Sequence, residues 1–154
     1  MFENLICVNS DSIDVKMLQS CNSIIAAFLP GKTVRFNTKE EIGCFSDFFQ
    51  IELDPTLTFF TLYYYQKDKL LLSRKYDLLP LTLEQIITLP GKEALHQIQV
   101  KRAIYLFLQD LTGKKVPWGI LTGVRPGKLV LRMQELGIPM VEQKKILAEL
   151  YMVD

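Results

Sequence analysis

The stretch from Val100 to Leu136 constrains the fold of this chain most, because it predicts two helices joined by a structured loop. Gly113 stands where a left-handed helix cap favours a residue without Cβ, so we expect the first helix to end there. We expect Pro126 to begin the second helix, and Gly137 followed by Pro139 to end it. At helical spacing, one face of the first helix carries Val100, Ile104, Phe107, Leu108 and Leu111, and the other carries Lys101, Arg102, Gln109 and Asp110.

The loop between these helices holds the only tryptophan of the chain, Trp118, and a tight corner from Thr122 to Pro126. Two arrangements stay open for Trp118. Its ring could be wedged between the two helices with its N–H bonded to a loop carbonyl. Alternatively, the ring could lie at a surface that meets another domain or a flat aromatic substrate.

These residues also carry a resemblance to a known enzyme family. Lys101-Arg102, the run from Pro117 to Pro126, Lys128-Leu129 and the closing Tyr151-Met152-Val153 resemble the amino-terminal part of oxygen-independent coproporphyrinogen III oxidase-like proteins. These are the hemZ-type coproporphyrinogen dehydrogenases, which are radical S-adenosylmethionine (SAM) enzymes of haem and porphyrin biosynthesis. The resemblance covers about residues 98 to 154, whereas residues 1 to 97 match only in length and general pattern.

The resemblance implies that this chain is a non-catalytic accessory domain of a longer enzyme. The parent oxidoreductase would bind a [4Fe–4S] iron-sulfur cluster and SAM, and would oxidatively decarboxylate propionates of coproporphyrinogen or act on a related tetrapyrrole. The partner of this domain would be the missing C-terminal catalytic domain of the same chain, which it would dock on or help to close over the substrate.

The cysteines decide whether this chain itself could hold such a cluster. The family binds its cluster through Cys-x-x-x-Cys-x-x-Cys, whereas Cys7, Cys21 and Cys44 are widely separated here. Cys21 falls on the apolar face of a predicted helix, where cysteine usually behaves as a small buried hydrophobe. We therefore expect no catalytic residue, cofactor or metal in this chain. His96 is its only histidine, which excludes a two-histidine metal site.

The first half of the chain predicts a sheet. Strands are expected at Leu5–Val8, Thr33–Asn37, Phe48–Leu53, Leu57–Gln66 and Leu70–Tyr76, the last two joined as a hairpin by Lys67-Asp68-Lys69. A helix capped by Ser10 or Asp11 should run to Leu29. One turn of helix is expected near Leu83–Ile87, and a third C-terminal helix at Val141–Leu150. The fold class is α+β: an antiparallel-rich sheet with helices on one face, followed by a C-terminal helical segment. A sheet region, 1–97, and a helical region, 98–154, would form one domain.

Charge is distributed unevenly along the chain. Residues 101–132 hold seven Lys or Arg against Asp110 alone, whereas residues 1–100 hold nine Lys or Arg against twelve Asp or Glu. This basic block is either a solvated helix face or a site that meets an anion. Free N–H groups before the second helix could help to hold a carboxylate or phosphate. The candidate anion-binding or domain-docking residues are Trp118, Thr122, Gly123, Arg125 and Lys128.

An alternative to the enzyme domain is a stand-alone binding module for an anionic ligand or RNA. Tyr63, Tyr64 and Tyr65 could stack bases, but strand alternation divides them between two faces, and the sheet half is acidic. No stretch approaches eighteen consecutive apolar residues, which argues against a membrane span. The start lacks a basic segment and a cleavage pattern, so a cytoplasmic location is expected.

Overall fold

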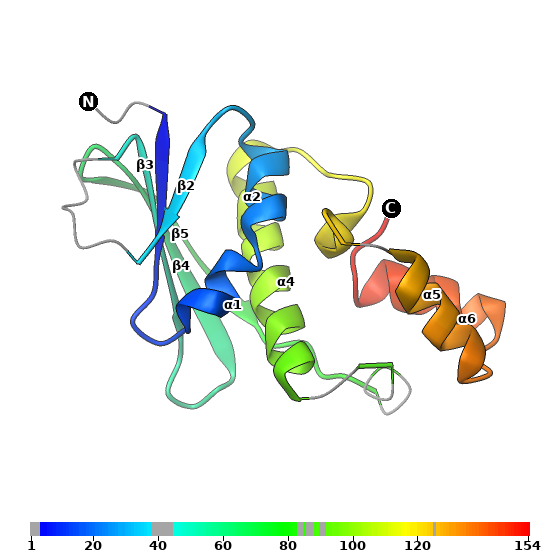
Figure 1. Ribbon diagram of the computed structural model, residues 1–154. Helices are drawn as coiled ribbons and strands as arrows, with labels where there is room; N and C mark the ends of the chain where they lie inside the picture. Colours follow the sequence, from blue (N-terminus) through cyan, green and yellow to red (C-terminus); the bar gives the residue numbers. More distant parts are fainter. Residues whose placement is uncertain (1–3, 38–44, 83–84, 86–87, 90–91, 125) are drawn as a thin grey trace.

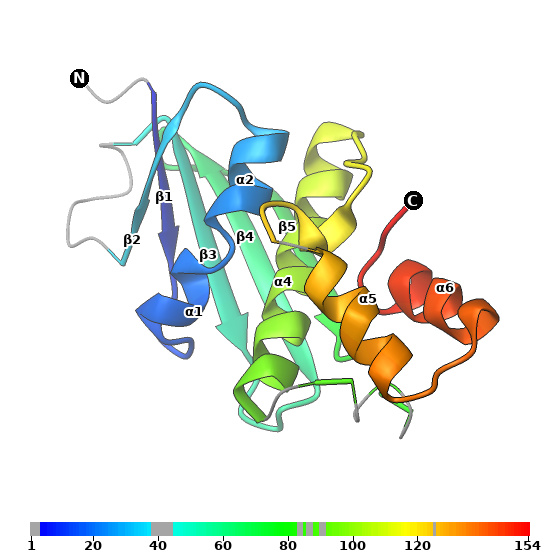
Figure 2. The same cartoon turned by 45° about the vertical axis from the view of Figure 1, so that its right-hand side comes forward.

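The structure is a computed structural model that describes residues 4–37, 45–82, 85, 88–89, 92–124 and 126–154. The chain folds as three successive layers, which Figures 1 and 2 show from two directions. A five-stranded sheet forms the first layer, and helices α1 (Val15–Gln19), α2 (Asn22–Phe28) and α4 (Lys92–Thr112) cover one of its faces. The C-terminal lobe forms the third layer. It contains the 3₁₀ turn η2 (Gly119–Leu121) and helices α5 (Pro126–Glu135) and α6 (Met140–Glu149).

The α+β class is confirmed, but the sheet is mixed rather than antiparallel-rich. Its strands are β1 (Leu5–Asn9), β2 (Thr33–Phe36), β3 (Asp47–Leu53), β4 (Phe59–Gln66) and β5 (Lys69–Asp77), in the order β2-β1-β3-β4-β5. Strand β1 is parallel to both β2 and β3, while β3–β4 and β4–β5 are antiparallel. The two helices between β1 and β2 bring the chain back to the end of the sheet at which β1 begins. Strand β2 therefore runs in the same direction as β1, which makes the pair parallel.

The predicted hairpin between β4 and β5 is confirmed. Lys67 and Asp68 form its turn with φ of 49° and 67°, the left-handed values that a two-residue type I′ turn requires. Tyr64 is buried and points into the core, whereas its neighbours Tyr63 and Tyr65 are half-buried on the opposite face. The three tyrosines therefore do not share one surface.

The single helix expected from Ser10 or Asp11 to Leu29 is wrong, because the structure has two helices there. Asp14 caps α1 by accepting a hydrogen bond from the Lys16 backbone N–H, whereas the Ser10 hydroxyl accepts one from the Ile13 N–H, before the helix. The break falls at Ser20, whose hydroxyl donates to the Met17 carbonyl at 2.6 Å. Serine competes in this way with the backbone bonds of a helix, which disfavours its continuation.

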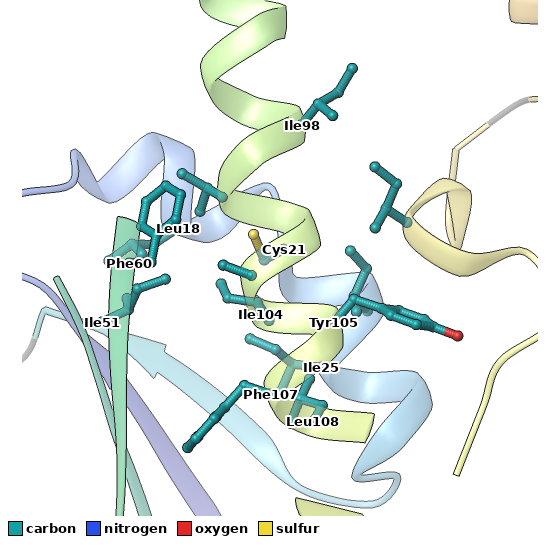
Figure 3. Close-up of a cluster of buried hydrophobic side chains, with 14 of the residues drawn as sticks. Leu18, Cys21, Ile25, Ile51, Phe60, Ile98, Ile104, Tyr105, Phe107 and Leu108 are labelled. Carbon is teal, nitrogen blue, oxygen red and sulfur yellow. The ribbon is translucent and has the colours of Figure 1, made fainter. Parts of the chain in front are cut away.

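Helix α4 is the centre of the fold, and it is buried on two sides rather than one. Toward the sheet, Phe107 packs edge-on against Phe49 with ring centroids 6.1 Å apart. Tyr105 packs edge-on against Phe28 of α2, with ring centroids 5.2 Å apart. Figure 3 shows Tyr105 and Phe107 projecting from opposite sides of α4. The predicted cap at Gly113 is confirmed, with φ of 71° and its N–H bonded to the Gln109 carbonyl at 2.8 Å. The division expected at residue 97 falls inside this helix.

The C-terminal helices begin and end close to the predicted residues. Helix α5 starts at Pro126, and Gly137 follows its end with φ of 72°. No helix in the described part of the chain is long and apolar enough to cross a membrane. The helical turn expected at Leu83–Ile87 lies outside the described residues, except for Gln85.

Candidate functional site

The loop between α4 and α5, the motif loop, contacts the C-terminal tail, so two separate pieces of the resemblance lie side by side. The tail that contains Tyr151 and Met152 lies against η2, where the Ile120 N–H donates to the Tyr151 carbonyl at 2.9 Å. The Asp154 N–H donates to the Pro117 carbonyl, also at 2.9 Å. A Cβ on Gly119 would stand 2.3 Å from the carbonyl oxygens of both Tyr151 and Met152. Only glycine permits this approach of two backbones, and φ of 52° at Gly119 adds to the requirement.

The expectation that Trp118 is wedged between two helices is wrong. Trp118 is 52% exposed and stands just before η2. The following turn directs Ile120 and Leu121 inward instead, where both are buried. These two aliphatic side chains face α4 in place of the tryptophan ring, which stays at the surface. Their burial was hard to predict from the sequence, because two apolar residues in a loop are too few to show a helical or strand repeat.

The other predicted site residues divide between supporting and exposed positions. The Thr122 hydroxyl donates to the Gly119 carbonyl at 2.7 Å, which closes the motif loop on itself. Gly123 has φ of 81°, and a Cβ there would stand 2.3 Å from the Ser23 hydroxyl of α2. Lys128 is exposed in the first turn of α5. Arg125 lies outside the described residues.

A cavity of about 530 Å³ opens between α4 and the lobe, beside the motif loop. Its walls come from α4, η2, α5, the C-terminal tail and residues 88–89. The lining is formed by Thr88, Leu89, Ala94, Gln97, Ile98, Lys101, Ile120, Leu121, Val124, Lys128, Leu129 and Tyr151. Most of these side chains are apolar, and the described lining contains no acidic residue. Its volume lies within the range of about 300–1,000 Å³ that is usual for small-molecule sites.

Lys101 is the residue of this cavity that sequence reasoning misplaced. The helical pattern assigned it to the solvent face of α4, but the lobe covers that face and leaves Lys101 only 9% exposed. Burial lowers the pKa of its ammonium group, although the Cys21 thiol opposes this shift. Within the described part of the chain, Lys101 forms no ion pair or hydrogen bond. The burial of Lys101 depends on the lobe packing against α4, so the sequence of α4 alone does not predict it.

Cys21 does not supply the missing counter-charge for Lys101. Burial raises the pKa of this thiol to about 12, more than its contacts with Ser20 and Lys101 lower it. The thiol is therefore neutral at physiological pH. Cys7 is also buried, on the opposite face of the sheet, where its thiol donates to Asn9 Oδ1 at 3.1 Å, while Cys44 lies outside the described residues. His96 is half-buried in the first turns of α4.

Two arginines of the basic block bind backbone carbonyl groups. Arg102 donates from Nη1 to the Glu149 and Leu150 carbonyls, at 2.6 and 2.8 Å, and so holds the C-terminal end of α6. Arg132 donates from Nε to the Thr88 carbonyl at 2.9 Å. These bonds connect the lobe to the rest of the fold, which gives both arginines a structural role. The exposed Lys114, Lys115 and Lys128 remain as surface charges.

Comparisons of the chain with protein-family models, with curated proteins and with solved structures find no match.

Proposed function

We propose that this chain is the non-catalytic amino-terminal domain of a radical SAM, coproporphyrinogen III oxidase-like enzyme, and that its C-terminal lobe docks on the catalytic domain. The family assignment rests on the resemblance of Lys101-Arg102, Pro117–Pro126, Lys128-Leu129 and Tyr151–Val153. The catalytic domain of the same chain would hold the [4Fe–4S] cluster and SAM, and would decarboxylate the propionates of a tetrapyrrole substrate in the cytoplasm.

The distribution of exposed apolar side chains supports the docking role. Among the described residues, nine large apolar side chains are exposed to solvent, and six of them lie between residues 118 and 141. These six, the docking surface, are Trp118, Val124, Leu131, Leu136, Met140 and Val141. A concentration of apolar groups on one part of a surface is typical of a protein interaction site. Exposed tryptophan is also enriched at the centres of such interfaces.

Half of the docking surface lies at the part of the lobe farthest from the sheet. Leu136, Met140 and Val141 lie at or beside the turn that joins α5 to α6, which Figure 2 shows on the side away from the strands. Helix α5 buries Met133 against the fold, whereas its Leu131 points to solvent. The main core extends from the sheet into the lobe, where Met133 and Ile146 are buried, and the exposed sides of α5 and α6 are left to present this surface to a partner.

The first experiment reads the gene beyond the codon for Asp154. A Cys-x-x-x-Cys-x-x-Cys motif in the following stretch supports the assignment, because three closely spaced thiolates are what the family's cluster needs. A stop codon supports the stand-alone binding module instead.

The second experiment measures docking by isothermal titration calorimetry between this chain and its separately produced catalytic domain. Leu131→Glu places a charge on the docking surface, and we expect it to weaken binding at least tenfold. Leu71→Glu is the matched control, because Leu71 is similarly exposed on β5, at the far side of the molecule. Equal effects of the two substitutions, or no effect of either, would contradict docking through the lobe.

A further inference from the structure

The cavity between α4 and the lobe combines an apolar lining with one largely buried lysine, Lys101. Ile98 and Ala94 of α4 face the apolar residues of η2 and α5 across it. Lys101 is the only lysine that the described chain buries, and it lines this cavity. Transferring an ammonium group from water into apolar surroundings is costly unless an opposite charge or hydrogen bonds accompany it. The Lys101 Nζ is not a fully buried atom, so it keeps contact with the open cavity and is available there to an anionic group.

No neighbouring group of the described chain supplies a negative charge to pair with Lys101. The Cys21 thiol beside Lys101 keeps its proton at neutral pH, as described above. Tyr151 also lines the cavity, and burial raises the pKa of its phenol, so it stays neutral. The other charge in the lining is Lys128, which is positive as well. The electrostatic character of the cavity is thus positive, without an acidic group to compensate.

We propose that this cavity binds a small organic carboxylate with an apolar body, and that Lys101 pairs with the carboxylate. The apolar body would occupy the space among Ile98, Ile120 and Leu129, where burial of hydrocarbon supplies the binding energy. The carboxylate would supply the hydrogen bonds and the negative charge that Lys101 lacks. Lys128 would bring a second positive charge that attracts the anion to the cavity. This inference is independent of the docking role proposed for the outer surface of the lobe.

The chemistry favours a carboxylate over a bulkier, more strongly charged anion. A single lysine acts as a point charge and offers up to three donors, whereas a phosphate site usually adds an arginine fork or several backbone N–H groups. Arg102 of α4 and Arg132 of α5 are already bound to carbonyl oxygens. An apolar cavity with one largely buried lysine therefore matches a ligand with one carboxylate better than a polyanion.

The test compares pairs of probes that differ only in charge. Decanoate and 2-naphthoate are titrated into the chain by calorimetry, beside the neutral decanol and 2-naphthalenemethanol. We expect each carboxylate to bind at least tenfold more tightly than its neutral analogue. In Lys101→Met, which replaces the charge with an apolar chain of similar length, we expect this preference to disappear. Lys114→Met is the matched control, because Lys114 is exposed on the loop after α4, and it should leave the preference unchanged.

A second variant separates the cavity from the charge. Ala94→Phe keeps Lys101 but fills part of the cavity, so all four probes should bind at least tenfold more weakly, while thermal melts verify that the variant is folded. Coproporphyrin III is titrated as a further carboxylate. Binding of it that depends on Lys101 identifies a tetrapyrrole propionate as the source of the carboxylate, whereas binding of decanoate or naphthoate alone indicates a free organic acid. Equal binding of charged and neutral probes, a preference that survives Lys101→Met, or no binding of any probe would overturn the proposal.

Discussion

The contact between the motif loop and the C-terminal tail makes a quantitative prediction at Gly119. An added Cβ there would lie 2.3 Å from the Tyr151 and Met152 carbonyl oxygens, far inside ordinary van der Waals contact. Gly119→Ala must therefore move the tail by about an ångström. Such a shift would disrupt the hydrogen bonds from Ile120 to Tyr151 and from Asp154 to Pro117, both at 2.9 Å.

The size of the effect follows from two contributions. A non-glycine residue in the left-handed region costs about 1–2 kcal/mol. Losing two backbone hydrogen bonds costs about 1–3 kcal/mol more. We expect Gly119→Ala to lower the free energy of unfolding by about 2–5 kcal/mol, measured by urea denaturation followed through circular dichroism.

Gly113→Ala provides the matched control. Gly113 has a similar φ of 71°, but a Cβ there meets no atom within 4 Å. This variant should lose only the conformational contribution of about 1–2 kcal/mol. Equal losses for the two variants would refute the reasoning, because the contact with the tail would then have no energetic effect.

Two further predictions concern stability. Trp118→Ala should lower the free energy of unfolding by less than about 1 kcal/mol in urea melts, because the ring is 52% exposed. A loss near 3 kcal/mol would show that the ring is buried after all. The second concerns Asp47, where burial would raise the pKa of the carboxyl, but hydrogen bonds from Lys32 and Tyr64 outweigh it and hold the pKa below the usual 3.8. Its contribution is present above pH 3.8 and is lost as the pH falls through the lowered pKa, so Asp47→Asn should be about 1–3 kcal/mol less stable at pH 7. This difference should shrink on acidification to about pH 2, and a difference that stays constant would exclude titration of Asp47 as its source.

Local patterns predicted most of the elements correctly. The β4–β5 hairpin was predictable because strand-forming residues flank a short polar turn, and the turn has the expected left-handed geometry. The caps at Gly113 and Gly137 were predictable for a similar reason, since a positive φ is a property of one residue and its neighbours. The break between α1 and α2 was missed because the apolar spacing continues across Ser20. The Ser20 hydroxyl competes for a backbone carbonyl group, and the spacing of apolar residues does not show this competition.

Of the site residues proposed from the sequence, Lys128 lines the cavity, whereas Lys101 was not among those proposed. The motif residues marked the loop before α5, and the cavity does lie beside that loop. Of the two arrangements left open for Trp118, the structure has the one at the surface. Lys101 was assigned to the wrong environment. Helical periodicity describes a single buried face, whereas α4 is covered on both sides, by the sheet layer and by the lobe. No pattern within α4 indicates that second cover.

The sequence by itself determined where the chain forms most of its strands, turns and helices, because those choices depend on interactions within a few residues. It also determined the α+β class, through the order of those elements. Only the tertiary structure decided that β1 pairs in parallel on both sides, that Lys101 is buried, and that Trp118 remains in solvent. The reason is that strand pairing and burial depend on segments far apart in the chain, such as Tyr151 against Gly119. Those contacts form, and stabilise the protein, only when the three layers pack together.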